Sequence, residues 1–113
     1  MDSLDPRFIK ADVERRRYRR VKLVIKIHCE ALNRHDVLET RNVSIGGMFI
    51  NVRSPMPVNS ELSLTFQLWP AEPAITCRAR VMFSRLGLGM GIQFLDLSGA
   101  AQKMLQRFVD EVA

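Results

Sequence analysis

The chain has 113 residues and a mass of 12.9 kDa, which predicts one domain and excludes a two-domain enzyme, because single-core domains typically hold about 100 to 150 residues. Apolar residues make up 47% and charged residues 26%, the balance of a folded globular protein, and the net charge is +5. No apolar run approaches the roughly 18 residues of a membrane-spanning helix, and the acidic start is unlike a signal peptide, so we expect a cytoplasmic protein.

The excess positive charge lies at the N-terminal end of the chain. Through Lys26 there are nine basic and four acidic residues, and from Ile27 onward there are eight of each. Five arginines stand in the six positions from Arg15 to Arg20, and their mutual repulsion predicts an acidic partner. The planar guanidinium fork suits bidentate contact with phosphate. A solvated arm, or one that binds nucleic acid or anionic lipid without specificity, explains the charge equally well.

After this arm the chain shows period-two apolar patterns, which predict strands. The first, Val21 to Cys29, alternates apolar residues with Lys22, Lys26 and His28. We interpret residues 33–36 as a polar turn and residues 69–73 as a loop. The glycines of the last pattern indicate a curved sheet or a bulge. The expected strands are 21–29, 37–43, 48–52, 61–68, 75–83 and 88–95.

The last segment predicts one amphipathic helix from Gly99 to Val112, with Ser98 as its cap, because apolar residues recur at spacings of three and four. Six strands joined by short turns form an antiparallel sheet that must cover its edges, and closure into a barrel does so most completely. The predicted fold is therefore all-β: a six-stranded antiparallel β-barrel with a C-terminal α-helix. Residues 1–14 are expected to form a flexible N-terminal arm, and residues 15–113 the domain.

Residues that could carry catalysis are sparse. His28 lies on the polar face of a strand and His35 in the predicted turn, which favours ordinary surface histidines. Ser44 has no evident histidine and aspartate partners, and the chain has no Gly-rich phosphate loop. Cys29 and Cys77 lack metal-type spacing and are interpreted as buried thiols. We therefore expect neither an enzyme nor a metal site.

Two short motifs remain, and together they resemble the ligand signature of the PilZ domain family, bacterial receptors for cyclic di-GMP. Arg16 and Arg20 are the two ends of an R-x-x-x-R motif in the arm. Residues 42–47, Asn-Val-Ser-Ile-Gly-Gly, match [DN]-x-S-x-x-G, with Asn42 in place of the commoner aspartate. The resemblance extends from about Glu14 to the C-terminal helix and includes the Gly89 to Phe94 segment.

The resemblance implies a PilZ-type barrel that binds cyclic di-GMP at one edge without catalysis and rearranges its arginine arm to signal to an effector protein. It implies that Asn42 and Ser44 hydrogen-bond a guanine and that Gly47 permits close approach. It also implies that an arginine at position 15 favours two stacked ligand molecules over one. No cofactor other than this ligand is expected. The implied ligand contacts are Arg15, Arg16, Arg20, Asn42, Ser44, Gly47 and Arg85.

Two alternatives remain open. A PilZ-like domain can serve as a protein-interaction adaptor without binding ligand, although such members usually lack the arginines. A basic module for nucleic acid or a membrane surface would explain the charge but not Asn42, Ser44 and Gly47. Tyr18 is the only aromatic residue within the basic cluster, so specific nucleic-acid binding by stacking is not expected.

Overall fold

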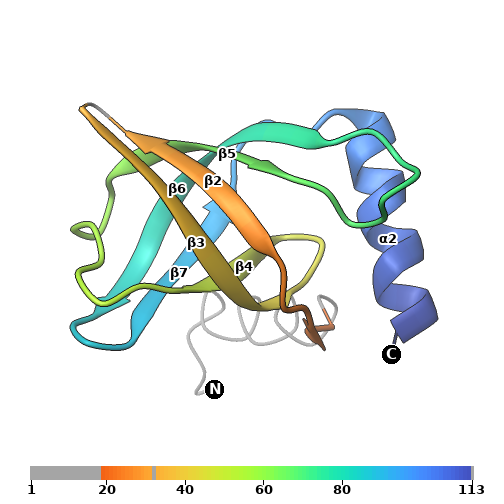
Figure 1. Cartoon of the computed structure of the whole chain (residues 1–113). Coiled ribbons are helices and arrows are strands. Elements are labelled where there is room, and N and C mark those ends of the chain that lie inside the picture. The colour runs from red at the N-terminus through yellow and green to blue at the C-terminus, as the bar shows by residue number, and fades with distance from the viewer. Residues whose placement is uncertain (1–18, 32, 113) are drawn as a thin grey trace, which may run out of the picture.

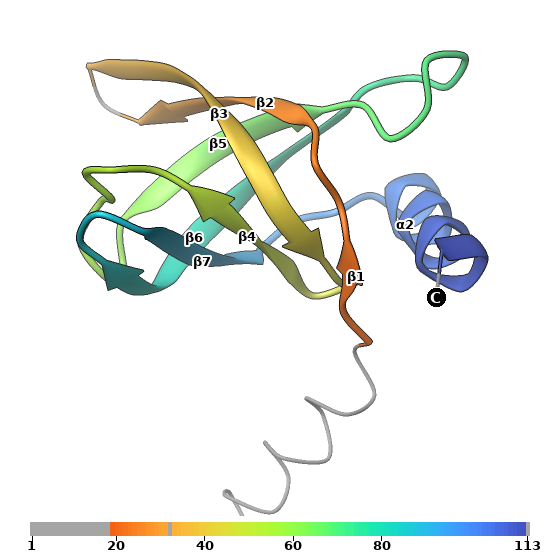
Figure 2. The same ribbon diagram turned by 60° about the horizontal axis from the view of Figure 1, so that its bottom comes forward.

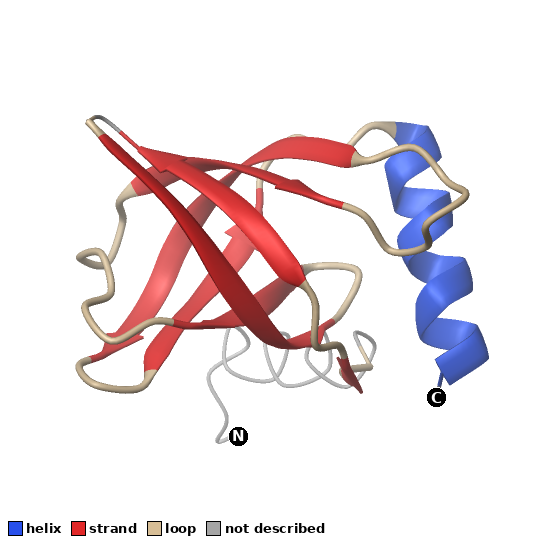
Figure 3. Cartoon of the chain, in the orientation of Figure 1, coloured by secondary structure: helices blue, strands red, loops and turns tan. Residues whose placement is uncertain are grey.

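The computed structural model describes residues 19–31 and 33–112, which form a closed antiparallel barrel with one helix beside it (Figure 1). The predicted arm, residues 1–14, lies outside the described residues. Figure 3 separates the strands of the barrel from the C-terminal helix by colour. The elements are β1 Val21–Lys22, β2 Lys26–Ala31, β3 Arg34–Val43, β4 Gly47–Asn51, β5 Glu61–Phe66, β6 Ile75–Arg85, β7 Gly89–Phe94 and α2 Gly99–Val112.

Six strands close the barrel in the order β3-β2-β5-β6-β7-β4, and pairing of β4 with β3 completes the ring. Every pairing is antiparallel, which confirms the predicted all-β barrel. The seventh strand, β1, lies outside this ring and pairs with the end of β3, where Val21 stands opposite Val43 (Figure 2). The short β1 therefore holds the start of the described chain against β3.

The prediction of one unbroken strand from Val21 to Cys29 was wrong. Lys22 pairs with Asn42 and Lys26 with Glu39, so three residues of this segment face only two residues of β3. The buried hydroxyl of Thr40 stabilises the extra residue: it donates to the Leu23 carbonyl at 2.6 Å and accepts from the Ile25 amide at 3.1 Å. Side chains still alternate between core and solvent, which is why the pattern concealed the break.

The predicted turn over residues 33–36 was also wrong, because Arg34 to Asp36 belong to β3. Arg34 pairs with Ala31 and His35 with Glu30, so the hairpin is tighter than the polar composition indicated. Arg34 and Asp36 point to the same face and form a 3.0 Å ion pair. These polar residues therefore stabilise a strand at the barrel surface.

The sequence predicted a curved sheet or a bulge at the glycine-containing strand, and the structure has a bulge in its neighbour β6. Val81 pairs with Ile92 and Phe83 with Gly91, which leaves Met82 as the extra residue of β6. The strand then continues to Arg85, two residues past its predicted end.

The predicted helix is confirmed over Gly99–Val112, and its buried apolar stripe belongs to the same core as the barrel strands. Ser98 caps it, because its hydroxyl accepts a 3.1 Å hydrogen bond from the Ala101 amide. Trp69 anchors the loop between β5 and β6 to the helix by an edge contact with Phe108, at 5.4 Å between ring centroids. Cys29 and Cys77 are free and buried, as expected.

Candidate functional site

The turn between β3 and β4 is organised by a buried serine. Ser44 is only 2% exposed, and its hydroxyl accepts hydrogen bonds from the amides of Gly46, at 3.1 Å, and Gly47, at 3.3 Å. The Ser44 amide donates to the Gly47 carbonyl at 2.8 Å. The hydroxyl that the resemblance assigns to the ligand therefore already shapes the turn around the ligand motif.

Gly47 begins β4 and lies against the backbone of β7, opposite Gln93. A β-carbon here would collide with the carbonyl oxygen of Ile92 and lie 3.1 Å from its carbonyl carbon. Glycine is thus required at this position by the pairing of β4 with β7. The resemblance attributed this glycine to ligand access, and a sequence motif carries no information about the β7 backbone.

The structure brings the second arginine of the arm motif to the first residue of the turn motif. A guanidinium nitrogen of Arg20 donates a 2.8 Å hydrogen bond to Oδ1 of Asn42. The pairing of Lys22 with Asn42 positions the two side chains, because it places β1 beside the end of β3. Two residues that are 22 positions apart in the chain therefore meet at one surface. Arg15 and Arg16 lie outside the described residues.

Arg85 is not brought to this turn. It stands opposite Gly89 at one end of the β6–β7 hairpin, whereas Gly47 stands opposite Gln93 at the other end of β7. The two levels are four residue steps apart along β7, about 13 Å along an antiparallel strand. Its assignment as a ligand contact stays a prediction, and its place is on the outer surface of the barrel.

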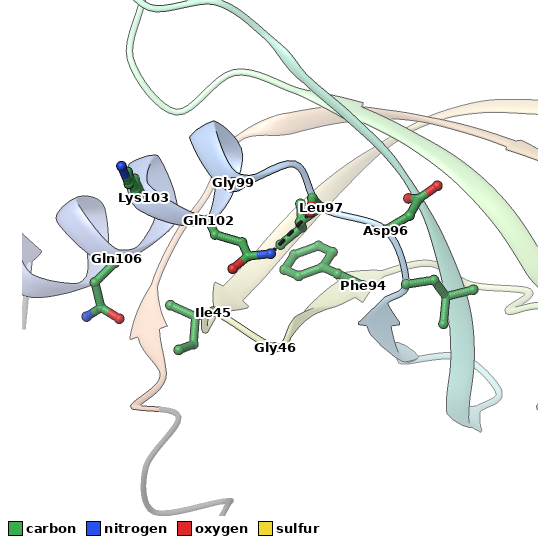
Figure 4. Close-up of a pocket in the computed structure, with 10 residues that line it drawn as sticks. Ile45, Gly46, Phe94, Asp96, Leu97, Gly99, Gln102, Lys103 and Gln106 are labelled. Carbon is green, nitrogen blue, oxygen red and sulfur yellow. Dashed lines mark hydrogen bonds between the residues drawn. The ribbon is translucent and has the colours of Figure 1, made fainter.

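A pocket of about 550 Å³ adjoins the turn on the side of the helix (Figure 4). Ile45 and Gly46 line one side, and Gln102, Lys103 and Gln106 line the other. The pocket arises where α2 lies next to the turn, so the chain sequence carried no signal for it.

Several basic residues of the barrel and helix pair with acidic residues nearby. Arg78 hydrogen-bonds Asp96 through its backbone amide, at 2.6 Å, and through Nε, at 3.1 Å. These bonds lower the pKa of the Asp96 carboxyl. Arg80 and Arg107 pair with glutamates at 3.0 and 2.8 Å. Among the described residues, no carboxylate lies within 4 Å of the Arg20 guanidinium.

The histidines and cysteines that the structure describes lie in strands of the barrel. His28 and His35 are exposed and lie 3.4 Å apart between ring nitrogens, and His35 is in β3 rather than in a turn. Burial raises the pKa of Cys29 to about 12 and that of Cys77 to about 11, which keeps both as thiols at neutral pH. Within residues 19–31 and 33–112, no three metal-ligating side chains are grouped to hold an ion.

Comparison with known families decides the assignment of this fold and signature. The family model described as PilZ domain matches residues 14–111, nearly the whole chain. The chain belongs to the PilZ domain family. The match covers the barrel, the turn motif, the arginine motif and the helix of this PilZ domain.

Two solved structures share the PilZ fold with this chain. The inhibitor of motility MotI/DgrA from Bacillus subtilis superposes with a TM-score of 0.73 at 18% identity, covering 83% of this chain and 49% of that one, so this chain spans about half its length. The PilZ domain of YcgR from Escherichia coli, solved with c-di-GMP, gives a TM-score of 0.62 at 16% identity and covers 87% of this chain and 91% of that chain. A search of curated proteins found no match. In the part of the chain that the structure describes, no helix is long and apolar enough to cross a membrane.

Proposed function

We propose that this PilZ domain is a receptor for cyclic di-GMP, with its site at Arg20, Asn42 and the β3–β4 turn, completed by Arg15 and Arg16 of the arm. The observation that carries the proposal is the 2.8 Å hydrogen bond from Arg20 to Asn42, which unites the two halves of the ligand signature. The YcgR PilZ domain, which has the same fold, was solved with this ligand.

The chemistry of these side chains suits the ligand. Cyclic di-GMP carries two phosphates and two guanines, and a guanidinium fork binds either a phosphate or the O6 and N7 edge of guanine. Asn42 offers both a donor and an acceptor to a base edge. The Arg20 guanidinium donates its hydrogen bond to the Asn42 amide oxygen, and no carboxylate of the described residues lies within 4 Å of it. A phosphate can therefore bind this guanidinium without breaking an ion pair with a described residue.

The proposed mechanism is a non-catalytic switch. The ligand phosphates neutralise the arginines of residues 15–20, which repel one another when no ligand is bound. The arm then folds over the β3–β4 turn and forms a surface for an effector protein. Hydrogen exchange tests this step: amides of residues 12–20 should gain protection when cyclic di-GMP is added. Equal protection with and without the ligand would show that the arm is not the switch.

Calorimetry with cyclic di-GMP tests the site itself. Arg16→Ala and Arg20→Ala should each weaken binding about 10-fold to more than 100-fold, because each removes charge-assisted hydrogen bonds. Arg19→Ala is the matched control, since it removes the same charge from a position between the motif arginines. Equal losses of affinity in all three variants would show that these arginines act only through general electrostatic attraction and not as a specific site.

Binding assays on the wild-type chain also distinguish the alternative functions. Binding of a DNA duplex with no binding of cyclic di-GMP would favour the basic nucleic-acid module and contradict the proposal. Absence of binding to either probe would favour the adaptor that has no ligand.

The arginine variants also need a folding control. A melting temperature near that of the wild-type chain shows that a variant has lost affinity for the ligand and has not unfolded.

A further inference from the structure

A row of side chains crosses the outer face of the barrel, starting at the proposed ligand residue Asn42. Asn42 pairs with Phe49, Phe49 with Gly91, and Gly91 with Phe83, across β3, β4, β7 and β6. The two phenylalanine rings are 5.9 Å apart between centroids, with 36° between their planes. Three strand spacings place Phe83 about 14 Å from Asn42 on the same surface.

Two glycines of β7 seat these rings against bare backbone. A β-carbon at Gly91 would collide with the ring of Phe83, and one at Gly89 would lie 2.7 Å from Cε1 of Phe49. Each ring therefore lies against the outside of the sheet where a side chain would otherwise stand. Phe83 is 49% exposed, so part of its ring is open to solvent.

Polar and basic groups surround the rings. The Arg41 guanidinium lies 5.1 Å from the centroid of the Phe49 ring. Arg85 follows Phe83 by two residues on the same strand, and an interval of two keeps it on the same face. One acidic side chain, Glu39, pairs with Asn51 in the next row. Cations interleaved with exposed aromatic rings are typical of surfaces that bind nucleotides.

Asn51 adds an unused acceptor to this face. Its Oδ1 is buried and has no hydrogen-bond partner among the described residues. Asn51 lies two residues after Phe49 on β4 and pairs with Gly89, which in turn pairs with Arg85.

We propose that Phe83 and Phe49 form a stacking platform for a purine base of a cyclic dinucleotide bound at Arg20 and Asn42, with Arg41 and Arg85 as its cationic flanks. The inference rests on the proposed function and extends that site across four strands. A dinucleotide presents two bases at separate positions, and the row offers a hydrogen-bonding position at Asn42 and a stacking position at Phe83. Stacking suits the exposed ring because every base has an apolar face.

Calorimetry with cyclic di-GMP on three variants tests the platform. Phe83→Leu keeps apolar volume and removes the aromatic face, and should weaken binding about 5-fold to 150-fold. Phe83→Trp restores an aromatic face and should retain affinity. Met82→Ala is the matched control, because Met82 is the preceding residue and is also 49% exposed, and its affinity should not change. Each variant is melted first to verify its fold.

The outcomes distinguish this inference from the proposed function. If the wild-type chain binds and Phe83→Leu binds equally well, the platform is refuted while the receptor function stands. If Met82→Ala loses as much affinity as Phe83→Leu, the loss does not come from stacking and the platform is again refuted. If the unaltered chain does not bind, both proposals fail.

The same titrations identify which ligand molecule supplies the base. In the Arg15→Leu background we expect one ligand per chain. If adding Phe83→Leu to the Arg15→Leu variant weakens binding, the stacked base belongs to the ligand molecule held at Asn42. A Phe83→Leu variant that instead falls from two ligands to one, with the remaining affinity unchanged, assigns the base to the second molecule. Either result supports the platform.

Discussion

Replacing Gly47 by alanine separates two reasons for a glycine in the ligand motif. The motif by itself attributes this glycine to the approach of a ligand. The structure places the position of its β-carbon against the Ile92 carbonyl of the neighbouring strand. Because the obstacle is backbone and not a flexible side chain, it cannot rotate away, and either β4 or β7 must shift. We therefore expect Gly47→Ala to destabilise the folded protein even in the absence of any ligand.

The magnitude follows from what overpacking costs elsewhere. Inserting atoms into a well-packed site typically destabilises by about 1 to 3 kcal/mol, and a backbone collision belongs near the upper end. A loss of about 2 to 3 kcal/mol lowers the melting temperature of a domain this size by roughly 8 to 20 °C. Thermal unfolding followed by circular dichroism measures the shift, and urea titration measures the free energy of unfolding independently.

Gly99→Ala is the matched control, because no atom beyond the chain neighbours and the backbone of α2 itself lies within 4 Å of the β-carbon position at Gly99. Its melting temperature should stay the same or rise slightly, since alanine favours the helix. A Gly47→Ala variant that melts within a few degrees of the unaltered chain yet fails to bind cyclic di-GMP would refute the packing argument. In that case the function of Gly47 would be to let the ligand approach the backbone closely.

Three further outcomes follow from single side chains. Thr40→Val should lower the free energy of unfolding by about 2 kcal/mol in urea titration, because it leaves the Leu23 carbonyl and the Ile25 amide without their hydroxyl partner; an unchanged midpoint would contradict that role. Hydrogen bonds from Arg78 lower the pKa of Asp96 below its ordinary 3.8, so this stabilisation is present at neutral pH and is lost as the pH falls through the lowered value. Asp96→Asn should therefore lose less melting temperature than the unaltered chain between about pH 5 and about pH 3, and equal losses would show that the carboxyl does not contribute. Arg15→Leu should reduce the calorimetric stoichiometry from two cyclic di-GMP molecules per chain to one, and a value of one in the unaltered chain would contradict the stacked pair.

The proposed site joins residues that are local in sequence to residues that only the barrel brings near. Arg20 and Asn42 meet because β1 pairs with the end of β3, and that pairing depends on the three-residue step stabilised by Thr40. The proposed ligand site thus depends on the buried hydroxyl of Thr40, which is part of neither motif. Loss of Thr40 is expected to disturb ligand binding as well as folding.

The sequence by itself determined the features that depend on short-range pattern. Alternating apolar residues identify the core faces of the strands, and Ser98 followed by apolar spacings of three and four identifies the capped helix, because both are set by neighbours along the chain. The order and composition of the two motifs likewise indicated the PilZ family and the residues proposed to bind its ligand.

Only the tertiary structure decided the features that depend on pairing between distant strands. The break between Lys22 and Lys26 keeps the period-two alternation of exposure, so it was invisible until the register with β3 was known. The role of Gly47 depends on the backbone of β7, and the row from Asn42 to Phe83 depends on four strands meeting in register. These contacts join residues far apart in the chain, and their physical basis is the closure of the barrel, which no local pattern encodes.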